Sequence, residues 1–490
     1  MLKYEKGRVP MAAQQGGAAM TRRLPVEPAP GPLEYYATRF DDLFRRARAQ
    51  REGFRRYLEG LLLPAERNKT LTALANTEPV AGAQRKEAQS LQWFLSESGW
   101  DPGEVNERRL ELLVEDPASA PDEEGVLVID EHGDRKWGKK TAHVGKQWLG
   151  NIGKTDNGVV SVSSLWASEG VYYPLEVEPY TPAHHFEGGR SDDAFRTKLR
   201  IAGELVERSV AGDVPFRAVV ADSFYGEDED LKGDLERLGV GYVMALKESH
   251  SWWHKEGTIG ALWEAAERAG WNNADDPGRW EKVIRTFRDG HREAWWALEV
   301  EVGPYGPQRT RRALVVTTDP ERLPRLGTWY LNTNLPAPDS KRARDGEALA
   351  PASVAEIVRL YGLRMWVEQS YKQVKHALGW SDYQVRSDAA IRRHWQLVFC
   401  AFSLCWWACG EELDLGDPPG VVLEADGEQG DPAASEAEAR GEKERASSSP
   451  AFVAAGAQAG KGVAGTIRNA HSILEGVHRQ GPARRVESVA

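Results

Sequence analysis

The chain has 490 residues and a formal net charge of −11, with 41% hydrophobic and 28% charged side chains. This length allows two or three domains with a large apolar core. No run of 18 or more apolar residues exists, so we expect no membrane span. The N-terminus lacks the apolar segment of a signal peptide, which favours a cytoplasmic protein.

The acidic charge is concentrated near the C-terminus. Residues 411–445 carry an excess of nine acidic side chains, so the remainder of the chain is close to neutral. The net charge therefore does not exclude a nucleic-acid partner. We expect residues 1–31 and 411–490 to be disordered, because both are rich in small or polar residues and poor in large apolar ones.

The segment from residue 32 to 120 is predicted to be a helical domain. Apolar residues follow helical spacing from Leu33 to Leu63, before Pro64, and a second helix is predicted from Ala83 to Ser96. Seven arginines decorate the first helix: Arg39, Arg45, Arg46, Arg48, Arg51, Arg55 and Arg56. They could bind DNA phosphates, or they could merely solvate a helical cap, and the sequence leaves both interpretations open.

An α/β pattern begins in residues 121–250. Val126–Asp130 and Phe216–Asp222 are apolar runs that each end in an aspartate, and Glu131–Gly133 is predicted to turn the chain after the first. Further strands are predicted at 159–165, 171–177 and 242–246, and helices at 192–210 and 229–238. The carboxyl ends of adjacent strands in such a sheet converge on one crevice, so we expect Asp130 and Asp222 to lie together.

Residues 251–345 are predicted to be a β-rich insertion. Strands are expected at 280–287, 294–302 and 312–317, and Asp289-Gly290 predicts a hairpin turn between the first two. Trp329–Thr333 then returns the chain to the core, which residues 346–410 complete.

The last predicted helix, 391–409, is strongly apolar and contains all three cysteines of the chain. The spacing of Cys400, Cys405 and Cys409 matches neither a zinc site nor a disulfide framework. We therefore expect buried thiols in a reducing compartment.

The most informative segment is a single helix predicted between Ser353 and Gly379, with Glu356 at capping-box spacing from Ser353. At about 100° per residue, one stripe of this helix is apolar: Leu360, Leu363, Val367 and Val374. Four polar residues share an arc of about 60° beside that stripe: Tyr361, Arg364, Glu368 and Lys375. Such an arc could be a solvated face, but one carboxylate with two cations and a phenol suits a cleft that binds metal and phosphate.

These four residues are separated by two, three and six positions, which resembles the Y-R-E-K signature of bacterial insertion-sequence DDE transposases. The resemblance covers about residues 125–405. It implies an α/β fold: an RNase H-like mixed sheet with a β-rich insertion before the last catalytic glutamate, plus an N-terminal helical domain. It also implies an enzyme that cuts double-stranded DNA at terminal inverted repeats and joins the ends to target DNA. A terminal hairpin intermediate and a homodimer on DNA are further implications.

The resemblance makes Asp130, Asp222 and Glu368 the catalytic carboxylates. Two Mg²⁺ or Mn²⁺ ions about 3.5–4 Å apart suit such a trio, because hard cations take oxygen ligands. Arg364 and Lys375 would hold the phosphates beside the scissile bond, and Tyr361 would donate a hydrogen bond to one of them. Trp329 opens a W-x-L-x-T run and would stack on a base flipped out of the duplex end, or it would pack in the core.

The first aspartate is where the chain departs from this family. Related transposases often have Asp-Asp-Thr where this chain has Asp130-Glu131-His132. We prefer Asp130 over Glu131 as the first ligand, because Asp130 directly ends the apolar run. The departure keeps two alternatives open: a stand-alone metal-dependent nuclease of the same fold, and an inactive transposase relic that acts as a DNA-binding protein.

Overall fold

The structure is a computed structural model that describes residues 31–410, except 45–47, 65–66, 256, 288–290, 302, 304–309 and 345–347. The two segments predicted to be disordered lie outside these residues, apart from Gly31. Among the helices of the described part, none combines the length and the apolar character needed to cross a bilayer.

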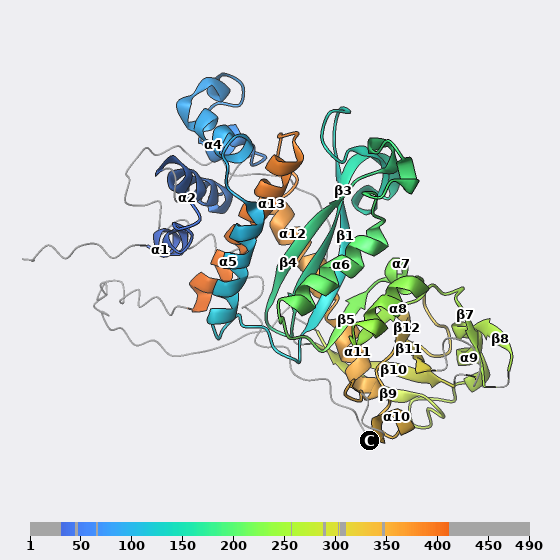
Figure 1. The fold of residues 1–490 in the computed structure, drawn as a ribbon. Helices are drawn as coiled ribbons and strands as arrows, with labels where there is room; N and C mark the ends of the chain where they lie inside the picture. The colour runs from blue at the N-terminus through green and yellow to red at the C-terminus, as the bar shows by residue number, and fades with distance from the viewer. Residues whose placement is uncertain are drawn as a thin grey trace, which may run out of the picture.

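A ten-stranded mixed sheet forms the centre of the molecule (Figure 1). Its strands are β1 (Val126–Arg135), β2 (Gly145–Leu149), β3 (Lys154–Ala167), β4 (Tyr172–Tyr180), β5 (Ala218–Ala221), β6 (Tyr242–Ala245), β9 (Glu281–Thr286), β10 (Arg292–Val300), β11 (Arg312–Thr317) and β12 (Thr328–Thr333). They lie in the order β2-β3-β1-β5-β6-β12-β11-β10-β9, and β4 pairs with β3. Antiparallel β4-β3-β1 followed by β5 and β6 parallel to β1 is the predicted RNase H-like arrangement.

Strand β1 is longer than the sequence predicts. It pairs with β3 along its whole length, from Val126 opposite Ala167 to Arg135 opposite Gly158. The prediction that Glu131–Gly133 turns the chain is therefore wrong. Gly133 serves close packing instead, because a Cβ at this position would lie 2.8 Å from Leu149 Cδ2.

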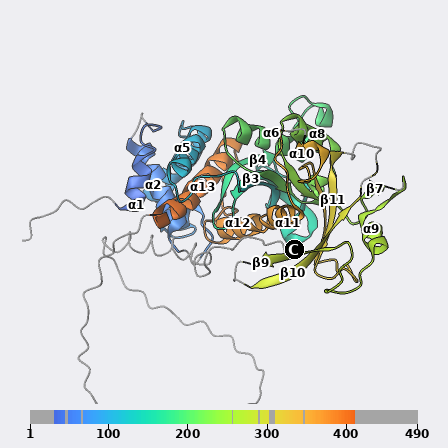
Figure 2. The same ribbon diagram turned by 90° about the horizontal axis from the view of Figure 1, so that it is seen from below.

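Helices cover both faces of the sheet (Figure 2). One face carries α6 (Lys198–Ala211) and α8 (Glu229–Arg237), and the other carries α11 (Val354–Gly362) and α12 (Met365–His376). Thr197 and Asp228 cap α6 and α8 by accepting backbone N–H bonds. Helix α6 begins later than its predicted start at 192, because residues 192–197 form a turn and an extended stretch up to the cap Thr197; the short 3-10 turns η3 (Ala183–His185) and η4 (Gly189–Ser191) precede this stretch.

The predicted insertion contributes strands to the same sheet. Strand β12 pairs with β6, and β11, β10 and β9 continue from it, with β9 and β10 forming the predicted hairpin. The predicted turn, Asp289-Gly290, lies outside the described residues. A second apolar cluster forms where α9 (Leu262–Ala269) packs on β10 and β11 beside the two-stranded sheet of β7 (Ser251–Trp253) and β8 (Ile259–Ala261). The short helix α10 (Lys341–Arg344) follows β12.

Helices from both ends of the described chain pack together. The N-terminal ones are α1 (Pro32–Thr38), α2 (Arg48–Leu62), α3 (Leu71–Leu74), η1 (Ala81–Gln84), α4 (Lys86–Ser96) and α5 (Pro102–Glu115). Of these, α1, α2, α4 and α5 pack on α13 (Asp388–Gly410), whose other side contacts β4 and α12. The single helix predicted from Leu33 to Leu63 is wrong. The chain turns after Thr38, because Phe40 and Phe44 fold back onto Phe54, with ring centroids 4.8 and 5.1 Å apart. Helix α5 was not predicted, although Asp101 caps it and Pro102 opens it.

Arg109 fastens this helical layer to the sheet. Its side chain is fully buried and donates to the carbonyls of Pro174 and Leu175 on β4 and to Ser403 on α13. The bundle and the sheet therefore share one core. In that core, Cys400 and Cys405 are buried thiols, as predicted, whereas the side chain of Cys409 lies outside the described part.

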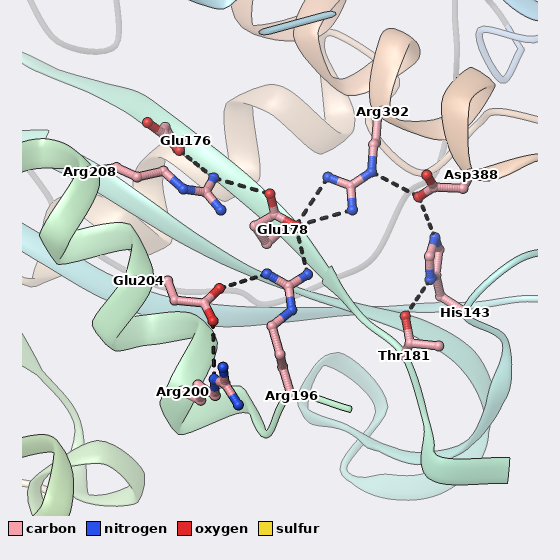
Figure 3. Close-up of polar contacts among 10 residues, drawn as sticks. All are labelled: His143, Glu176, Glu178, Thr181, Arg196, Arg200, Glu204, Arg208, Asp388 and Arg392. Atoms are coloured by element: carbon pink, nitrogen blue, oxygen red, sulfur yellow. Dashed lines mark hydrogen bonds and ion pairs between the residues drawn. The ribbon is translucent and has the colours of Figure 1, made fainter. Parts of the chain in front are cut away.

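A second buried ionic cluster joins β4, α6 and α13 (Figure 3). Glu178 lies at its centre, 7% exposed, and accepts from Arg196, Arg208 and Arg392. The outer members are Glu176, Glu204, Arg200, Asp388, His143 and Thr181. Burial opposes ionisation of Glu178, yet its three arginine partners lower its pKa. We call this group the Glu178 network.

Candidate active site

Asp130 lies on β1, two residues beyond the part of that strand that pairs with β5. Its side chain is about 15% exposed. Burial raises the pKa of Asp130 to about 7: the cation of Arg364 lowers it, but the nearby charge of Asp222 raises it further. The carboxyl group is therefore held where its negative charge is poorly compensated.

Asp222 directly follows β5, as predicted, and caps the short helix α7 (Ser223–Gly226) by accepting from the Phe224 N–H. Gly226 fixes this turn against the neighbouring strand β6. A Cβ at position 226 would lie 1.9 Å from the carbonyl oxygen of Ala245, so only glycine fits here without movement. The end of β5 therefore presents Asp222 at the same edge as Asp130.

Glu368 is on α12, but the single helix predicted from Ser353 to 378 is interrupted. Ser353 caps α11 as expected by accepting from the Glu356 N–H, whereas the Glu356 side chain pairs with Arg217. Helix α11 ends at Gly362, and α12 begins at Met365. Hydrogen bonds of the i to i+3 type cross the joint, including Arg364 N–H to Tyr361 and Val367 N–H to Arg364.

The predicted apolar stripe is buried on both sides of this joint. Leu360, Leu363, Val367 and Val374 are each at most 6% exposed. Gly379, with φ of 70°, lies just beyond α12 in the left-handed conformation that favours glycine. The apolar pattern and the stop signal were thus predictable, but the tight turn was not, because helical periodicity survives it.

Arg364 lies between the two aspartates. Its Nη2 is 3.6 Å from Asp130 Oδ1 and 3.8 Å from Asp222 Oδ2, so these oxygens are at most the sum of those distances, 7.4 Å, apart. Burial opposes protonation of Arg364, yet Asp130, Tyr361 and Asp222 raise its pKa overall. Arg364 therefore acts as the counter-ion of the strand aspartates.

The three predicted carboxylates line one cavity of about 500 Å³. Asp130, Asp222 and Glu368 share its wall with residues of β1, β2, the 3-10 turn η2 (Gly150–Ile152) and α12: Glu131, His132, Gly133, Trp148, Gly150, Asn151, Tyr371, Lys372 and Lys375. Three chain segments that are distant in sequence therefore meet at the same hollow. The side chains of Tyr361 and Trp329 are not part of this wall.

Glu131 has a different partner from Asp130. Its carboxylate lies 2.7 Å from Lys198 Nζ at the start of α6, while Asp130 contacts Arg364 beside α12. Successive residues of a strand point to opposite faces, which explains the division. Both line the cavity, but the neutralised Glu131 is the weaker candidate for a cation ligand.

Lys375 also faces the cavity, and its partner is a residue that the sequence did not single out. Asp134, buried on β1, lies 3.8 Å from Lys375 Nζ and accepts from Ser381; it is also 2.8 Å from His132 Nε2. Burial opposes ionisation, yet His132, Lys375 and Lys136 lower the pKa of Asp134 to about 2. The alternation of Asp130, His132 and Asp134 along one strand face would have been a usable signal for this role.

Trp329 belongs to an aromatic group beside the cavity. Its ring centroid is 4.7 Å from that of Trp295 and 4.9 Å from that of Tyr361, while the Arg285 guanidinium carbon lies 4.4 Å from the Trp329 ring. Burial lowers the pKa of Arg285 to about 10 and raises that of Tyr361. Trp329 is thus half-buried and packed against other rings, so it lies neither in a closed core nor on an open surface.

The donor set suits a divalent cation, although its present geometry is open. Carboxylate oxygens are the ligands of Mg²⁺ and Mn²⁺, and an added cation would relieve the poorly compensated Asp130. Within the described part of the chain, no three His, Cys, Asp or Glu side chains lie close enough together to hold an ion. Arg364 is instead the cation between the aspartates, and it must move for them to share a metal.

A mixed sheet with one aspartate on β1, a second directly after the adjacent parallel strand β5, and a glutamate on a covering helix is the arrangement of the RNase H-like nucleases. Comparison with known proteins agrees. Residues 39–298 match the DDE superfamily endonuclease family, and residues 197–404 match the transposase DDE domain. A probable transposase for insertion sequence element IS701 from Microchaete diplosiphon is 31% identical over 395 residues, which cover 79% of this chain and 92% of that protein. The chain therefore belongs to the insertion-sequence DDE transposases, enzymes that act on DNA.

Proposed function

We propose that this protein cuts double-stranded DNA at the ends of a mobile element and joins those ends to target DNA. The observation that supports this most directly is the shared cavity of Asp130, Asp222 and Glu368, with Arg364 and Lys375 beside them. The departure at Glu131-His132 leaves the carboxylate positions intact, because Asp130 keeps its place beside Asp222. This favours an active enzyme over a relic.

Each residue has a role in the proposed chemistry. Asp130, Asp222 and Glu368 would hold two Mg²⁺ or Mn²⁺ ions, which when bound stabilise the attacking and leaving oxygens of the displacement. Arg364 would exchange its carboxylate partners for the scissile phosphate, which its planar fork can bind bidentately. Lys375 would contact a neighbouring phosphate from the position that Asp134 gives it.

Trp329 would stack on a base flipped from the duplex end, and Tyr361 would support it through their edge-to-face contact. The flat guanidinium of Arg285 already packs on Trp329, which is the kind of contact a base would make. The proposal includes a hairpin intermediate at the end of the element, in which this terminal base is flipped out of the duplex.

The helical segment 32–120 would bind the terminal inverted repeats, with the chain acting as a homodimer on paired ends. Three of its arginines are engaged in ion pairs: Arg39 with Glu115, Arg48 with Glu52, and Arg55 with Glu34 and Glu59. Among the described arginines of this segment's first predicted helix, Arg51 and Arg56 are exposed, and they are the candidates for phosphate contacts.

The test is a cutting assay with Mg²⁺ on supercoiled plasmid carrying the inverted repeats that border the gene. We expect nicking at the repeats by the wild type and none by Glu368→Ala. Strand transfer from a precut end separates a transposase from a stand-alone nuclease. Repeat-specific binding without Mg²⁺- or Mn²⁺-dependent cutting would contradict the proposal and identify a DNA-binding relic.

A further inference from the structure

One edge of the sheet is strongly basic although the chain as a whole is acidic. Residues 135–156 contain six basic side chains and one acidic one, against a net charge of −11 for the chain. Seven exposed residues on β1, β2, β3 and the β1–β2 connection define what we call the basic edge: Arg135, Trp137, Lys139, Lys140, Lys146, Trp148 and Lys154.

The positive charge of the basic edge is mostly uncompensated. Its acidic residue, Asp156, lies 3.0 Å from Arg135 and 3.8 Å from Lys154. For Lys139, Lys140 and Lys146, no carboxylate of the described residues lies within ion-pair distance. A local field of this kind attracts a polyanion irrespective of the overall charge.

Two tryptophans on this edge are exposed, which is unusual for so large an apolar side chain. Trp137 is 81% exposed, with the Arg135 guanidinium carbon 4.2 Å from its ring centre. Trp148 is 54% exposed; on β2 it and Lys146 alternate with the buried residues Gly145, Gln147 and Leu149. Neither ring therefore contributes to the core, and both can stack on a ligand.

Trp148 connects the basic edge to the candidate active site. It lines the same cavity as the three carboxylates, together with Gly150 and Asn151 of η2. In the sheet order, β1 and β5 with their aspartates lie between β2 and β12, which carry Trp148 and Trp329 respectively. The candidate carboxylates are therefore placed between two tryptophans.

We propose that the basic edge binds the duplex DNA that flanks the element, on the far side of the scissile phosphate from the element's end. In this arrangement Trp329 receives the element end, Trp148 stacks on the first flanking nucleotide, and the lysines contact the phosphates beyond it. The inference rests on the proposed function, because that function assigns the element end to Trp329. Cations on neighbouring strands and their connection, interleaved with exposed aromatic rings, suit a nucleic-acid backbone better than an apolar protein surface.

The first test measures binding by fluorescence anisotropy without divalent metal. One duplex, taken from the DNA bordering the gene, ends flush at the cut site, and a second extends through the natural flank. The wild type should bind the extended duplex more tightly. Trp148→Ala should weaken binding of the extended duplex roughly tenfold, and Trp148→Phe should restore most of that loss.

The charge component is tested in the same assay. Replacing Lys139, Lys140 and Lys146 by alanine should reduce the slope of log affinity against log salt by about 2–3 for the extended duplex and leave it unchanged for the flush one. Lys341→Ala removes an exposed lysine on α10, outside the basic edge, and should change neither duplex. Equal weakening of both duplexes, or no weakening, would overturn the inference.

A crosslinking experiment tests the placement of Trp148. A 5-iododeoxyuridine at the first flanking position should crosslink, on irradiation, to the peptide that contains Trp148. A crosslink at Trp329 instead would reverse the proposed polarity and overturn the inference. A wild type that gains affinity from the flank but never cuts DNA would refute the proposed function alone, whereas equal binding of both duplexes would refute the flank site.

Discussion

Two buried ionic clusters on the same sheet differ in their charge balance. In the Glu178 network, four carboxylates meet four arginines, and the pKa of the central glutamate is lowered (Figure 3). In the candidate active site, three carboxylates share a cavity with one guanidinium between two of them, and the pKa of Asp130 is raised to about 7. The first cluster is complete within the protein. In the second, Lys372 and Lys375 also line the cavity, yet the charge of the buried Asp130 is poorly compensated, and a bound cation would compensate it.

The largest expected effect is the loss of activity when a carboxylate of the candidate active site is neutralised. Glu368→Gln should abolish Mg²⁺-dependent cutting, a loss beyond the roughly 10–100-fold typical of outer-shell partners of a metal site. Its side chain is exposed, so the free energy of unfolding should change by less than about 0.5 kcal/mol. Plasmid cutting and urea unfolding of the same preparations measure both quantities. Cutting at wild-type rate would remove Glu368 from the site.

The next effect is on stability. Glu178→Gln leaves three partly exposed arginines without their shared buried carboxylate, so the free energy of unfolding should fall by about 3 kcal/mol, the lower end of the range for a broken buried ion pair. Because the folded pKa of Glu178 lies below its unfolded value, its contribution is present above the unfolded value and is lost as pH falls through the folded one. Urea unfolding at pH 7 and at pH 3 should show the mutational difference shrinking at the lower pH.

Asp130→Asn should raise the free energy of unfolding, whereas Glu178→Gln lowers it. Because the folded pKa of Asp130 is raised to about 7, the metal-free wild type loses stability as pH rises from about 4 to 7. The asparagine variant avoids this loss and should be more stable by about 2 kcal/mol at pH 8 without metal, although inactive. Urea unfolding at pH 5 and pH 8, in EDTA, measures the difference. A variant that is destabilised at pH 8 would show that Arg364 fully compensates Asp130.

The smallest expected effect distinguishes neighbouring carboxylates. Glu131→Gln keeps the size of the side chain and removes only the charge that pairs with Lys198. If Asp130 is the ligand, cutting should fall less than about threefold, consistent with a partly exposed ion pair worth under about 1 kcal/mol. Lys198→Met serves as the matched control, since it breaks the same pair from the other side. A loss as large as that of Glu368→Gln would make Glu131 the ligand.

Local patterns in the sequence predicted much of the sheet and four residues of the cavity wall. Apolar runs located β1, β5 and β6, and the helical arc brought Glu368 and Lys375 to the cavity wall. Asp130 and Asp222 were found because each ends an apolar run, although β1 continues beyond Asp130 in the structure.

The features that were predicted wrongly or missed depend on contacts between residues that are distant in the sequence. Burial of Phe40 and Phe44 on Phe54 breaks the first helix, and pairing with β3 extends β1 beyond its apolar part. The anchor Arg109 has no local signature, whereas Asp134, the partner of Lys375, was missed although it alternates with Asp130 and His132 along β1. Periodicity specifies which face of an element is buried, but not what it meets.

Gly226 limits which amino-acid sequences can form this active site, because position 226 has no room for a side chain. The helical turn that starts at Asp222 rests on the backbone of the next strand, and even alanine would force one of them to shift. A saturation-mutagenesis survey should therefore find position 226 as intolerant as the carboxylates, although it carries no chemistry. The active site therefore requires glycine at position 226 as strictly as it requires the carboxylates.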